Sequence, residues 1–397
     1  MTTPSDPIVI TGAARTPMGG FQGALSAASA PELGASAIKA AMDRAGVAPE
    51  DVDEVFMGCV LPAGLGQAPA RQAALAGGLP LKTGCTTINK MCGSGMKASM
   101  LGHDLLKAGS AKVIVAGGME SMTNAPYLMD KARAGFRMGH GRVIDHMFLD
   151  GLEDAYDKGR LMGTFAEDCA EMYQFTREAQ DAFAIESLTR AKRAIDDGTF
   201  DREVVPVVIK GRKGDTTVSH DEQPGKANLE KIPTLKPAFR EGGTVTPANS
   251  SSISDGAAAL VLMSEAQASK RGITPVARII AHTTHAQAPA LFTTAPVGAM
   301  KKLFEITGWK PEEVDFFEVN EAFAVVTMAA MRELGLPHDK VNVHGGACAL
   351  GHPIGASGAR ILVTLLAALE KYDLNRGVAS LCIGGGEATA MAVERIR

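Results

Sequence analysis

Residues 87 to 109 read T-I-N-K-M-C-G-S-G-M-K-A-S-M-L-G-H-D-L-L-K-A-G, and the rest of the chain is organised around this stretch. An apolar approach ends at Cys92, glycines follow at positions 93 and 95, and a helix-forming run stops at Gly109. We therefore expect Cys92 in the first turn of a helix, where unpaired N–H groups and the helix dipole lower a thiol pKa. The glycines would leave the sulfur open to a bulky electrophile. On this stretch alone an ordinary buried cysteine is the simpler interpretation, so the rest of the chain must decide.

The composition is that of a globular protein with a large core. The chain has 397 residues, 46% of them hydrophobic and 21% charged, which is enough for two or three domains. Its formal net charge of -4 gives no basic field for a polyanion. Nucleic acid is therefore excluded as an expected partner.

The cysteines and the chain ends bear on compartment and metal binding. Six cysteines are scattered without a C-x-x-C pair, which argues against a zinc site or a disulfide framework and for a reducing compartment. The start, M-T-T-P-S-D-P, is polar, and no apolar run of about 18 residues occurs anywhere. We expect a soluble cytoplasmic protein with no membrane segment and no metal.

Strand-like and helix-like segments alternate along the first part of the chain. Strands are expected at 7–14, 52–58 and 112–118, and helices at 31–46 and 68–76. This alternation predicts an α/β protein with a parallel, doubly wound sheet. Residues 122–250 break the rhythm with a charged helix at 176–197 and a strand at 203–209, and they are expected to form an insertion.

The last part of the chain repeats the first. Residues 46–56 match 308–318, residues 93–97 match 356–360, and residues 116–120 match 383–387, at offsets between 262 and 267. Three matches in the same order indicate a duplicated half. Two similar halves would pack face to face and bring their helix N-termini together at the centre of the protein.

The second half supplies further residues with chemical potential. His352 stands in G-H-P-I-G, Cys382 ends the apolar run S-L-C-I before glycines 384–386, and Asn320 follows E-V-D-F-F-E-V. The duplication places His352 opposite Cys92, where it could take the thiol proton. Bare glycine N–H groups are suited to stabilising an oxyanion. A structural histidine and a core cysteine remain the alternatives for each residue taken alone, but the set as a whole suits acyl transfer through a thioester.

Five motifs in order resemble the thiolase family, and within it the biosynthetic acetyl-CoA acetyltransferases. They are N-K-M-C-G-S-G-M-K, G-G-M-E-S-M, N-E-A-F-A, G-H-P-I-G-A-S-G-A-R and C-I-G-G-G, and the resemblance covers nearly the whole chain. It implies a Claisen condensation of two acetyl-CoA molecules to acetoacetyl-CoA and CoA, and the reverse thiolysis, within fatty-acid metabolism.

The resemblance also implies a role for each catalytic residue. Cys92 matches the nucleophile that is acylated, and His352 the base that generates its thiolate and contributes to an oxyanion hole. Asn320 matches the amide that holds a catalytic water in that hole. Cys382 matches the acid/base that removes a proton from C2 of the second acetyl-CoA. The N–H groups of Cys92 and Gly384 match a second oxyanion hole.

The thiolase fold is implied as well: two duplicated βαβαβ halves in five α-β-α-β-α layers with an inserted loop domain. The halves would be residues 1–121, completed by 251–273, and residues 274–397. Residues 122–250 would be the loop domain that covers CoA. The resemblance further implies a homotetramer, a dimer of dimers, with acyl-CoA thioesters as substrates and no resident cofactor.

Substrate-binding positions follow from the same resemblance. Ser251 matches a serine that contacts CoA, and Met162, Ala322 and Phe323 match residues around the acyl and pantetheine groups, with core packing as their alternative. We assign Lys226 and its neighbours to the CoA phosphates. The chain departs from the pattern of short-chain relatives at Leu161, His344, Cys348 and Glu387, which affects acyl-chain preference and CoA contacts but leaves the catalytic set intact.

Four alternatives are weighed against acetyl transfer. A 3-ketoacyl-CoA thiolase for longer chains, working in the degradative direction, would share every catalytic residue and differ in pocket width. A decarboxylating condensing enzyme of the same fold is disfavoured by Cys382. A redox-sensing thiol protein would use Cys92 and Cys382 but would not need His352 and Asn320. A non-catalytic scaffold would not need the intact set.

Overall fold

A computed structural model describes residues 6–212 and 214–397. The first five residues of the polar start and Lys213, in the basic run at 210–215, lie outside the described residues. Within them, no helix is both long enough and apolar enough to cross a bilayer.

A mixed sheet runs through the centre of the protein in the strand order β12-β13-β14-β11-β1-β10-β5-β3-β4. The strands of its N-terminal side are β1 (Ile8–Arg15), β3 (Glu54–Gly58), β4 (Gly84–Ile88), β5 (Val113–Ser121) and β10 (Ser254–Ser264), and the short β2 (Gly19–Gly20) pairs with β10. Those of its C-terminal side are β11 (Ala277–Ala286), β12 (Phe316–Val319), β13 (Arg376–Ile383) and β14 (Glu387–Arg395). Only two residue pairs, Val9 with Arg278 and Ile10 with Ala277, join β1 to β11.

The expectation of a wholly parallel sheet is wrong. β3 runs parallel to β4 and β5, and β12 parallel to β13, but β10 pairs antiparallel with both β1 and β5. The chain returns to this sheet through the insertion at 122–250 and not through a crossover helix, so β10 is free to enter in the opposite direction. In the other half, β13 turns directly into β14 through three glycines, and a hairpin forces antiparallel pairing.

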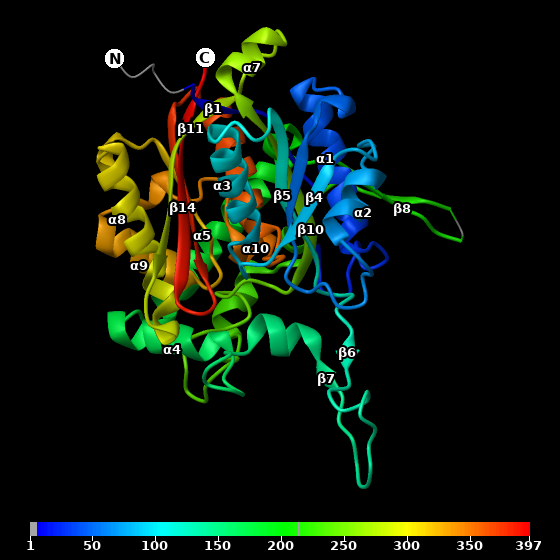
Figure 1. Cartoon of the computed structure of the whole chain (residues 1–397). Helices are drawn as coiled ribbons and strands as arrows, with labels where there is room; N and C mark the ends of the chain where they lie inside the picture. The colour runs from blue at the N-terminus through cyan, green and yellow to red at the C-terminus, as the bar shows by residue number, and fades with distance from the viewer. Residues whose placement is uncertain (1–5, 213) are drawn as a thin grey trace.

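Helices form three layers around the two sides of the sheet (Figure 1). Helices α1 (Ala30–Ala45) and α2 (Pro69–Ala76) cover the outer face of the N-terminal side, and α8 (Ala295–Thr307) and α9 (Ala324–Leu334) that of the C-terminal side. Between the two sides lie α3 (Ser94–Lys107) and α11 (Ser357–Lys371), whose apolar side chains pack with residues from both sides. The layers therefore follow the α-β-α-β-α order of the thiolase fold.

Sequence signals at the ends of α1 show why this helix begins and ends where it does. Ser29 and Glu32 form a capping box, and Pro31 lies in the first turn, where its missing N–H has no partner to lose. Gly46 ends the helix in the left-handed conformation at φ 62°.

The first turns of the two central helices are in close contact. A Cβ atom at Gly95 would lie 2.7 Å from the backbone nitrogen of Ala359, and one at Gly358 would lie 2.4 Å from that of Met96. The two glycines are equivalent positions of the duplicated halves. Their lack of a side chain lets the helix starts approach each other, as the repeat predicts.

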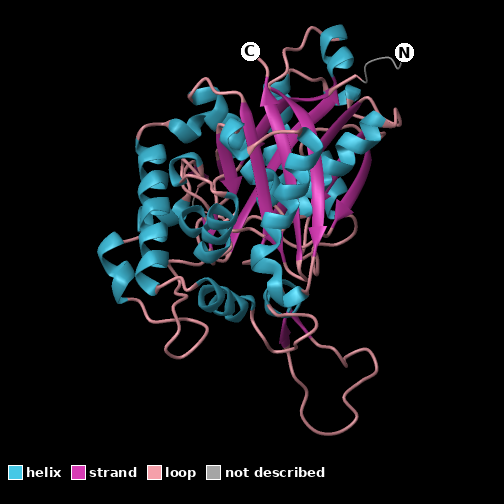
Figure 2. Ribbon diagram, turned by 90° about the vertical axis from the view of Figure 1, so that its left-hand side faces the viewer, coloured by secondary structure: helices cyan, strands magenta, loops and turns pink. Residues whose placement is uncertain are grey.

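Residues 122–250 add smaller elements outside the main sheet. They are β6 (Tyr127–Leu128), β7 (Ile144–Asp145), α4 (Met162–Tyr173), α5 (Arg177–Asp196), β8 (Val207–Ile209), β9 (Thr216–Val218) and α6 (Glu222–Lys226). Among them, α4, β6 and β7 lie beneath the sheet (Figure 1). Figure 2 shows the same region from the side. The chain between β6 and β7 projects from the body of the protein as a long loop, and the β8–β9 hairpin projects from another side. Two short helices, α7 (Glu265–Lys270) and α10 (Ala347–Leu350), complete the fold.

Candidate active site

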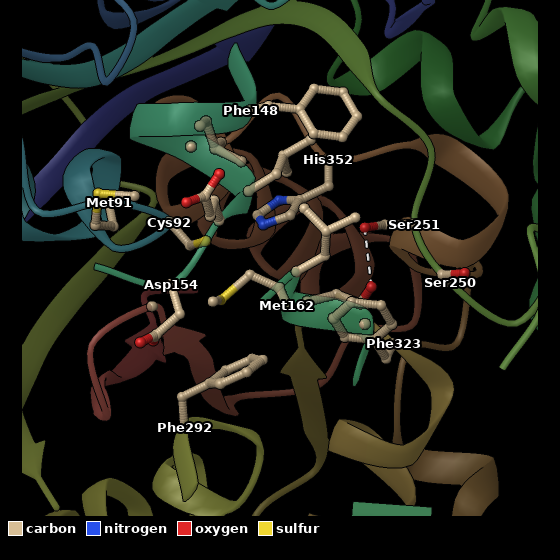
Figure 3. A pocket seen from close by; sticks show the side chains of 18 of the residues that line it. Met91, Cys92, Phe148, Asp154, Met162, Ser250, Ser251, Phe292, Phe323 and His352 are labelled. Atoms are coloured by element: carbon tan, nitrogen blue, oxygen red, sulfur yellow. Dashed lines mark hydrogen bonds between the residues drawn. The ribbon is translucent and has the colours of Figure 1, made fainter. Parts of the chain in front are cut away.

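A cavity of about 620 Å³ opens where the two halves and the insertion meet. Cys92 comes from the first half, His352 and Cys382 from the second, and Met162 from the insertion, and all four line it. Figure 3 shows Cys92, His352 and Met162 turned toward a common space. Most of the cavity wall is apolar, so a few polar groups control the chemistry inside it.

Cys92 lies between β4 and α3, two residues before the helix begins at Ser94. Met91 just before it adopts φ 46°, a left-handed conformation that is rare for a residue with a side chain. A Cβ at Gly93 would lie 2.3 Å from Cδ1 of Ile383. The glycines therefore serve close packing against the second half as well as access to the sulfur.

The expectation of a lowered thiol pKa at Cys92 is wrong. Burial raises the pKa of Cys92 to about 11, while the N–H groups of Gly384 and of Cys92 itself oppose part of this rise. Desolvation outweighs the helix start because the thiolate would lie in a mostly apolar cavity. The resting side chain is a thiol, and it needs a base to become a nucleophile.

His352 is held in the tautomer that such a base requires. Its Nδ1 lies 2.6 Å from Oγ of Ser357, and that hydroxyl donates to the Pro353 carbonyl at 3.0 Å. Because the Ser357 proton is committed to Pro353, we assign the Nδ1 proton to His352 as the donor to Oγ. Nε2 is buried, and no described residue hydrogen-bonds to it. Burial, with the charge of Arg360 adding to it, lowers the pKa of His352 to about 3, so the ring is neutral with a free Nε2 lone pair.

Asn320 lies behind His352 and does not line the cavity. Its Oδ1 accepts a hydrogen bond from Arg360 at 3.4 Å, and its Nδ2 lies 3.5 Å from Nδ1 of His352. Arg360 is fully buried and also contacts Glu318 at 3.3 Å. Burial raises the pKa of Glu318 to about 8, against the attraction of Arg360. Arg360 thus fixes the orientation of the Asn320 amide, with its oxygen toward Arg360 and its NH₂ group toward His352.

Cys382 is the second-to-last residue of β13 and is buried. Burial raises the pKa of the Cys382 thiol well above its ordinary value, and a negative charge on Cys92 would raise it further. The turn that follows contains Gly384, which lines the cavity, and then Gly385 and Gly386 at φ 94° and 88°. All six cysteines are free.

Four of the five residues assigned to substrate binding line the cavity. They are Ser251, Met162, Ala322 and Phe323. Ser251 Oγ donates to the Ala322 carbonyl at 2.9 Å, which joins the two segments on one wall (Figure 3). Lys226 is the residue that the structure does not bring to the cavity, since it ends α6 in an ion pair with Glu222 and its side chain is 65% exposed.

The sequence reasoning missed much of the cavity wall. Residues 148–156 line it, beginning with a short π-helix (Phe148–Leu152), as does Phe292. Their sequence carries no motif, because an apolar wall needs only size and shape. Two apolar residues side by side in an otherwise irregular segment, Phe148 and Leu149, are the only signal that could have been noticed.

Glu120 is a second residue that the sequence reasoning did not assign to the site, and it lies beneath Cys92. This fully buried carboxylate accepts N–H groups from Val60, Leu61 and Gly355 and the S–H group of Cys59. Burial raises the pKa of Glu120 to about 7, and the three N–H donors offset part of that rise. Since Gly355 belongs to the segment that carries His352, Glu120 ties that segment to the first half.

The four departures from the family pattern occupy different places. Leu161 lines the cavity, and Glu387 forms an ion pair with Lys90, two residues before Cys92. His344 and Cys348 are not among the lining residues. The His344 ring packs edge-on against Phe200, and burial lowers its pKa to about 4, whereas Cys348 lies against the Glu321 carbonyl.

Known protein families and curated relatives match nearly the whole length of the chain. The family described as Thiolase, N-terminal domain, matches residues 8–266, and Thiolase, C-terminal domain, matches residues 273–395. The chain is 50% identical over 390 residues to acetyl-CoA acetyltransferase of Cupriavidus necator, covering 98% of this chain and 99% of that protein. It is 51% identical over 391 residues to acetyl-CoA acetyltransferase 2 of Arabidopsis thaliana, covering 98% and 96%.

Solved structures give the same result. The crystal structure of the Bacillus anthracis acetyl-CoA acetyltransferase superposes with a TM-score of 0.96 at 41% identity, covering 99% of both chains. An Ascaris suum thiolase crystallised in complex with coenzyme A superposes with a TM-score of 0.93 at 40% identity, covering 98% of this chain and 100% of that one. With two family domains spanning nearly its whole length and relatives this similar, the chain belongs to the thiolase family.

Proposed function

We propose that this protein is an acetyl-CoA C-acetyltransferase, which condenses two acetyl-CoA molecules to acetoacetyl-CoA and CoA and also catalyses the reverse thiolysis. The observation that carries the proposal is the free Nε2 lone pair of His352 in a cavity shared with two thiols. Relatives at about half identity over the full length are named acetyl-CoA acetyltransferases, which favours acetyl transfer over the longer-chain and redox alternatives.

In the first half-reaction, Nε2 of His352 takes the Cys92 proton as the sulfur attacks the thioester carbon. The tetrahedral oxyanion receives hydrogen bonds from the protonated Nε2 of His352 and from a water molecule held by the Asn320 amide, which Arg360 orients. Collapse of this intermediate releases CoA, which takes its proton from the imidazolium, and leaves an acetyl group on Cys92.

In the second half-reaction, Cys382 acts as the base on C2 of a second acetyl-CoA. The thiol must first lose its own proton, because burial disfavours a resting thiolate, and the imidazole of His352 in the same cavity, neutral again after CoA has left, accepts it. The carbanion attacks the acetyl carbon on Cys92, and the N–H groups of Cys92 and Gly384, which lie toward the sulfur, stabilise the oxyanion there. Acetoacetyl-CoA leaves, and the Cys92 thiolate takes the proton from His352, which regenerates the thiol.

The apolar cavity supports the assignment of substrate positions. Met162, Ala322 and Phe323 surround the acyl and pantetheine groups, and Ser251 lies on the same wall. The CoA phosphates belong nearer the protein surface, where Lys226 would have to exchange its contact with Glu222 for the phosphate. The acyl group arrives and leaves on CoA, so the reaction requires no resident cofactor.

We also propose a homotetramer built as a dimer of dimers, in the cytoplasm and serving fatty-acid metabolism. The outermost strand β4 is mainly half-buried, which leaves its open edge for a second chain. The loop between β6 and β7 exposes apolar side chains, with Met138 96% exposed. Free cysteines fit a reducing compartment. Light scattering after gel filtration tests the assembly, and a monomeric mass would refute it.

Mass spectrometry after brief mixing with acetyl-CoA tests the chemistry. We expect a mass gain of about 42 Da on Cys92, as for an acetylated thiol. Cys92→Ser should lose the adduct, and Cys382→Ala should keep it yet form no acetoacetyl-CoA.

Mixing with 3-ketohexanoyl-CoA separates the chain-length alternatives. A butyryl adduct of equal rate would assign the protein to the broader thiolases. Absence of an adduct from both substrates would refute acyl transfer altogether.

A further inference from the structure

Three potential metal-ligand atoms meet where α3 crosses β11, outside the active site. Nδ1 of His103 lies 3.0 Å from Oδ1 of Asp104, and Nε2 of His282 lies 2.9 Å from the same oxygen. The two ring nitrogens are 3.2 Å apart, and the rings are nearly perpendicular, at 88°. The three atoms therefore form a nearly equilateral triangle.

Hydrogen bonding alone cannot satisfy this triangle. An ionised carboxylate only accepts, and each imidazole nitrogen is either a donor or an acceptor. If both nitrogens carry protons, both donate to Asp104 and the two N–H groups oppose each other across the 3.2 Å edge. If either nitrogen is bare, its lone pair faces the carboxylate oxygen instead. While Asp104 is ionised, one edge is therefore repulsive in every protonation state of the two rings unless a cation is bound.

A metal ion removes this conflict, because it accepts a lone pair from each of the three atoms. Bonds of about 2.1 Å to atoms about 3 Å apart subtend angles of roughly 90° at the metal. That is a facial set of two imidazoles and one carboxylate, which leaves three positions for water. Imidazole nitrogen selects first-row transition metals over Mg²⁺ and Ca²⁺.

We propose that His103, Asp104 and His282 bind a divalent first-row transition-metal ion. Solvent can reach the cluster, since the side chain of Asp104 is 56% exposed and those of both histidines are 14% exposed. A hydrated ion can therefore enter without unfolding the protein. Lys97, whose charge acts on His282, opposes the cation, so we expect reversible binding rather than a permanently held ion.

The site would join the two halves of the protein. His103 and Asp104 lie on the central helix of the first half, and His282 lies on a strand of the second, 178 residues from Asp104. Cys92 lies at the other end of α3, about 16 Å away at 1.5 Å per helical residue. The ion would strengthen the contact between the halves and would take no part in acyl transfer.

This site could not be foreseen from the sequence. The expectation of no metal rested on the absence of C-x-x-C pairs, and nothing in residues 103–104 points to position 282. Only the packing of α3 against the second side of the sheet brings the three ligands together.

Titration of the tag-free, full-length protein with Co²⁺ and Ni²⁺, followed by calorimetry and visible absorption, tests the proposal. We expect one ion per chain, a weak ligand-field spectrum without sulfur-to-cobalt charge transfer, and a melting temperature raised by a few degrees at saturation. Mg²⁺ should produce none of these changes.

Variants identify the ligands. His282→Ala and the isosteric Asp104→Asn should each weaken Co²⁺ binding at least tenfold, whereas His140→Ala, at an exposed histidine elsewhere, should leave it unchanged. Far-UV circular dichroism and acetyl transfer to Cys92 should be preserved in all three, which separates this proposal from the proposed function. Undiminished binding in both ligand variants, binding abolished by Cys92→Ser, or no binding at millimolar metal would overturn the proposal.

Discussion

Replacing Glu120 should show how strongly one buried carboxylate holds the two halves together beneath Cys92. Its Oε2 accepts the N–H groups of Val60 and Gly355, both at 2.9 Å. Its Oε1 accepts the N–H of Leu61 at 3.1 Å and the thiol of Cys59 at 3.6 Å. Each of the two oxygens therefore has a defined pair of donors, and the two simplest substitutions remove different numbers of hydrogen bonds.

Glu120→Ala leaves three buried N–H groups unpaired. At about 1–3 kcal/mol for each, the free energy of unfolding should fall by about 3–9 kcal/mol. In Glu120→Gln the amide oxygen can take the place of Oε2 and keep Val60 and Gly355, while the amide nitrogen faces the N–H of Leu61. One N–H loses its acceptor, so the cost should be about 1–3 kcal/mol.

Urea unfolding at one fixed protein concentration measures these losses, because assembly makes stability concentration-dependent. Glu305→Gln, at an exposed position on α8, is the matched control and should change stability by less than about 0.5 kcal/mol. Both Glu120 variants should also slow acetylation of Cys92, since Gly355 follows His352 by three residues. If Glu120→Ala costs under about 1 kcal/mol, or no more than Glu120→Gln, the reasoning is wrong.

The same residue should contribute to the pH dependence of stability. Burial raises the pKa of Glu120 from 4.5 to about 7, so within that window the folded protein holds a proton that the unfolded chain has released. Its contribution to the free energy of unfolding should therefore fall as pH rises from 4.5 to about 7 and be constant outside that window. Glu120→Gln should remove this part of the slope.

Two further predictions concern the nucleophile and its loop. Alkylation of Cys92 by iodoacetamide should accelerate about tenfold per pH unit between about pH 7 and 9, because burial raises the pKa of Cys92 to about 11. An alkylation rate that reaches a plateau below about pH 8 would contradict this. Lys90→Met should lower kcat for condensation by about three- to tenfold, because it removes the ion pair between Lys90 and Glu387, which joins the loop of Cys92 to the loop that follows Cys382. The double variant Lys90→Met/Glu387→Met should lower kcat no more than the worse of the two single variants. Additive losses in that cycle would show that the two residues act independently.

Local chemistry in the sequence accounts for much of the fold. The capping box at Ser29 and the left-handed Gly46 mark the ends of α1, because caps act on the nearest backbone groups. The expected strand at 112–118 is found as β5, extended to Ser121 by pairing with β10. The repeat correctly predicted that the starts of α3 and α11 meet, since equivalent glycines allow the contact.

Among the site residues, the sequence by itself singled out the groups that we propose to carry the chemistry. Three residues stand among glycines or near the end of an apolar strand, namely Cys92, His352 and Cys382. Their neighbours in the sequence alone show these surroundings. Tertiary structure alone decided the state of those groups. The pKa of Cys92 depends on the surfaces that close over it, and the tautomer of His352 depends on the hydrogen bond from Ser357 to Pro353.

The same division explains the remaining differences between expectation and structure. Whether β10 runs parallel or antiparallel depends on the path of the preceding 130 or so residues, not on its own apolar sequence. The triangle of His103, Asp104 and His282 joins positions that no local pattern connects. A sequence specifies helices, strands and reactive groups through contacts between neighbours in the chain. Burial, strand direction and convergence of distant side chains arise only when the two halves pack, because those free energies belong to surfaces that do not exist before folding.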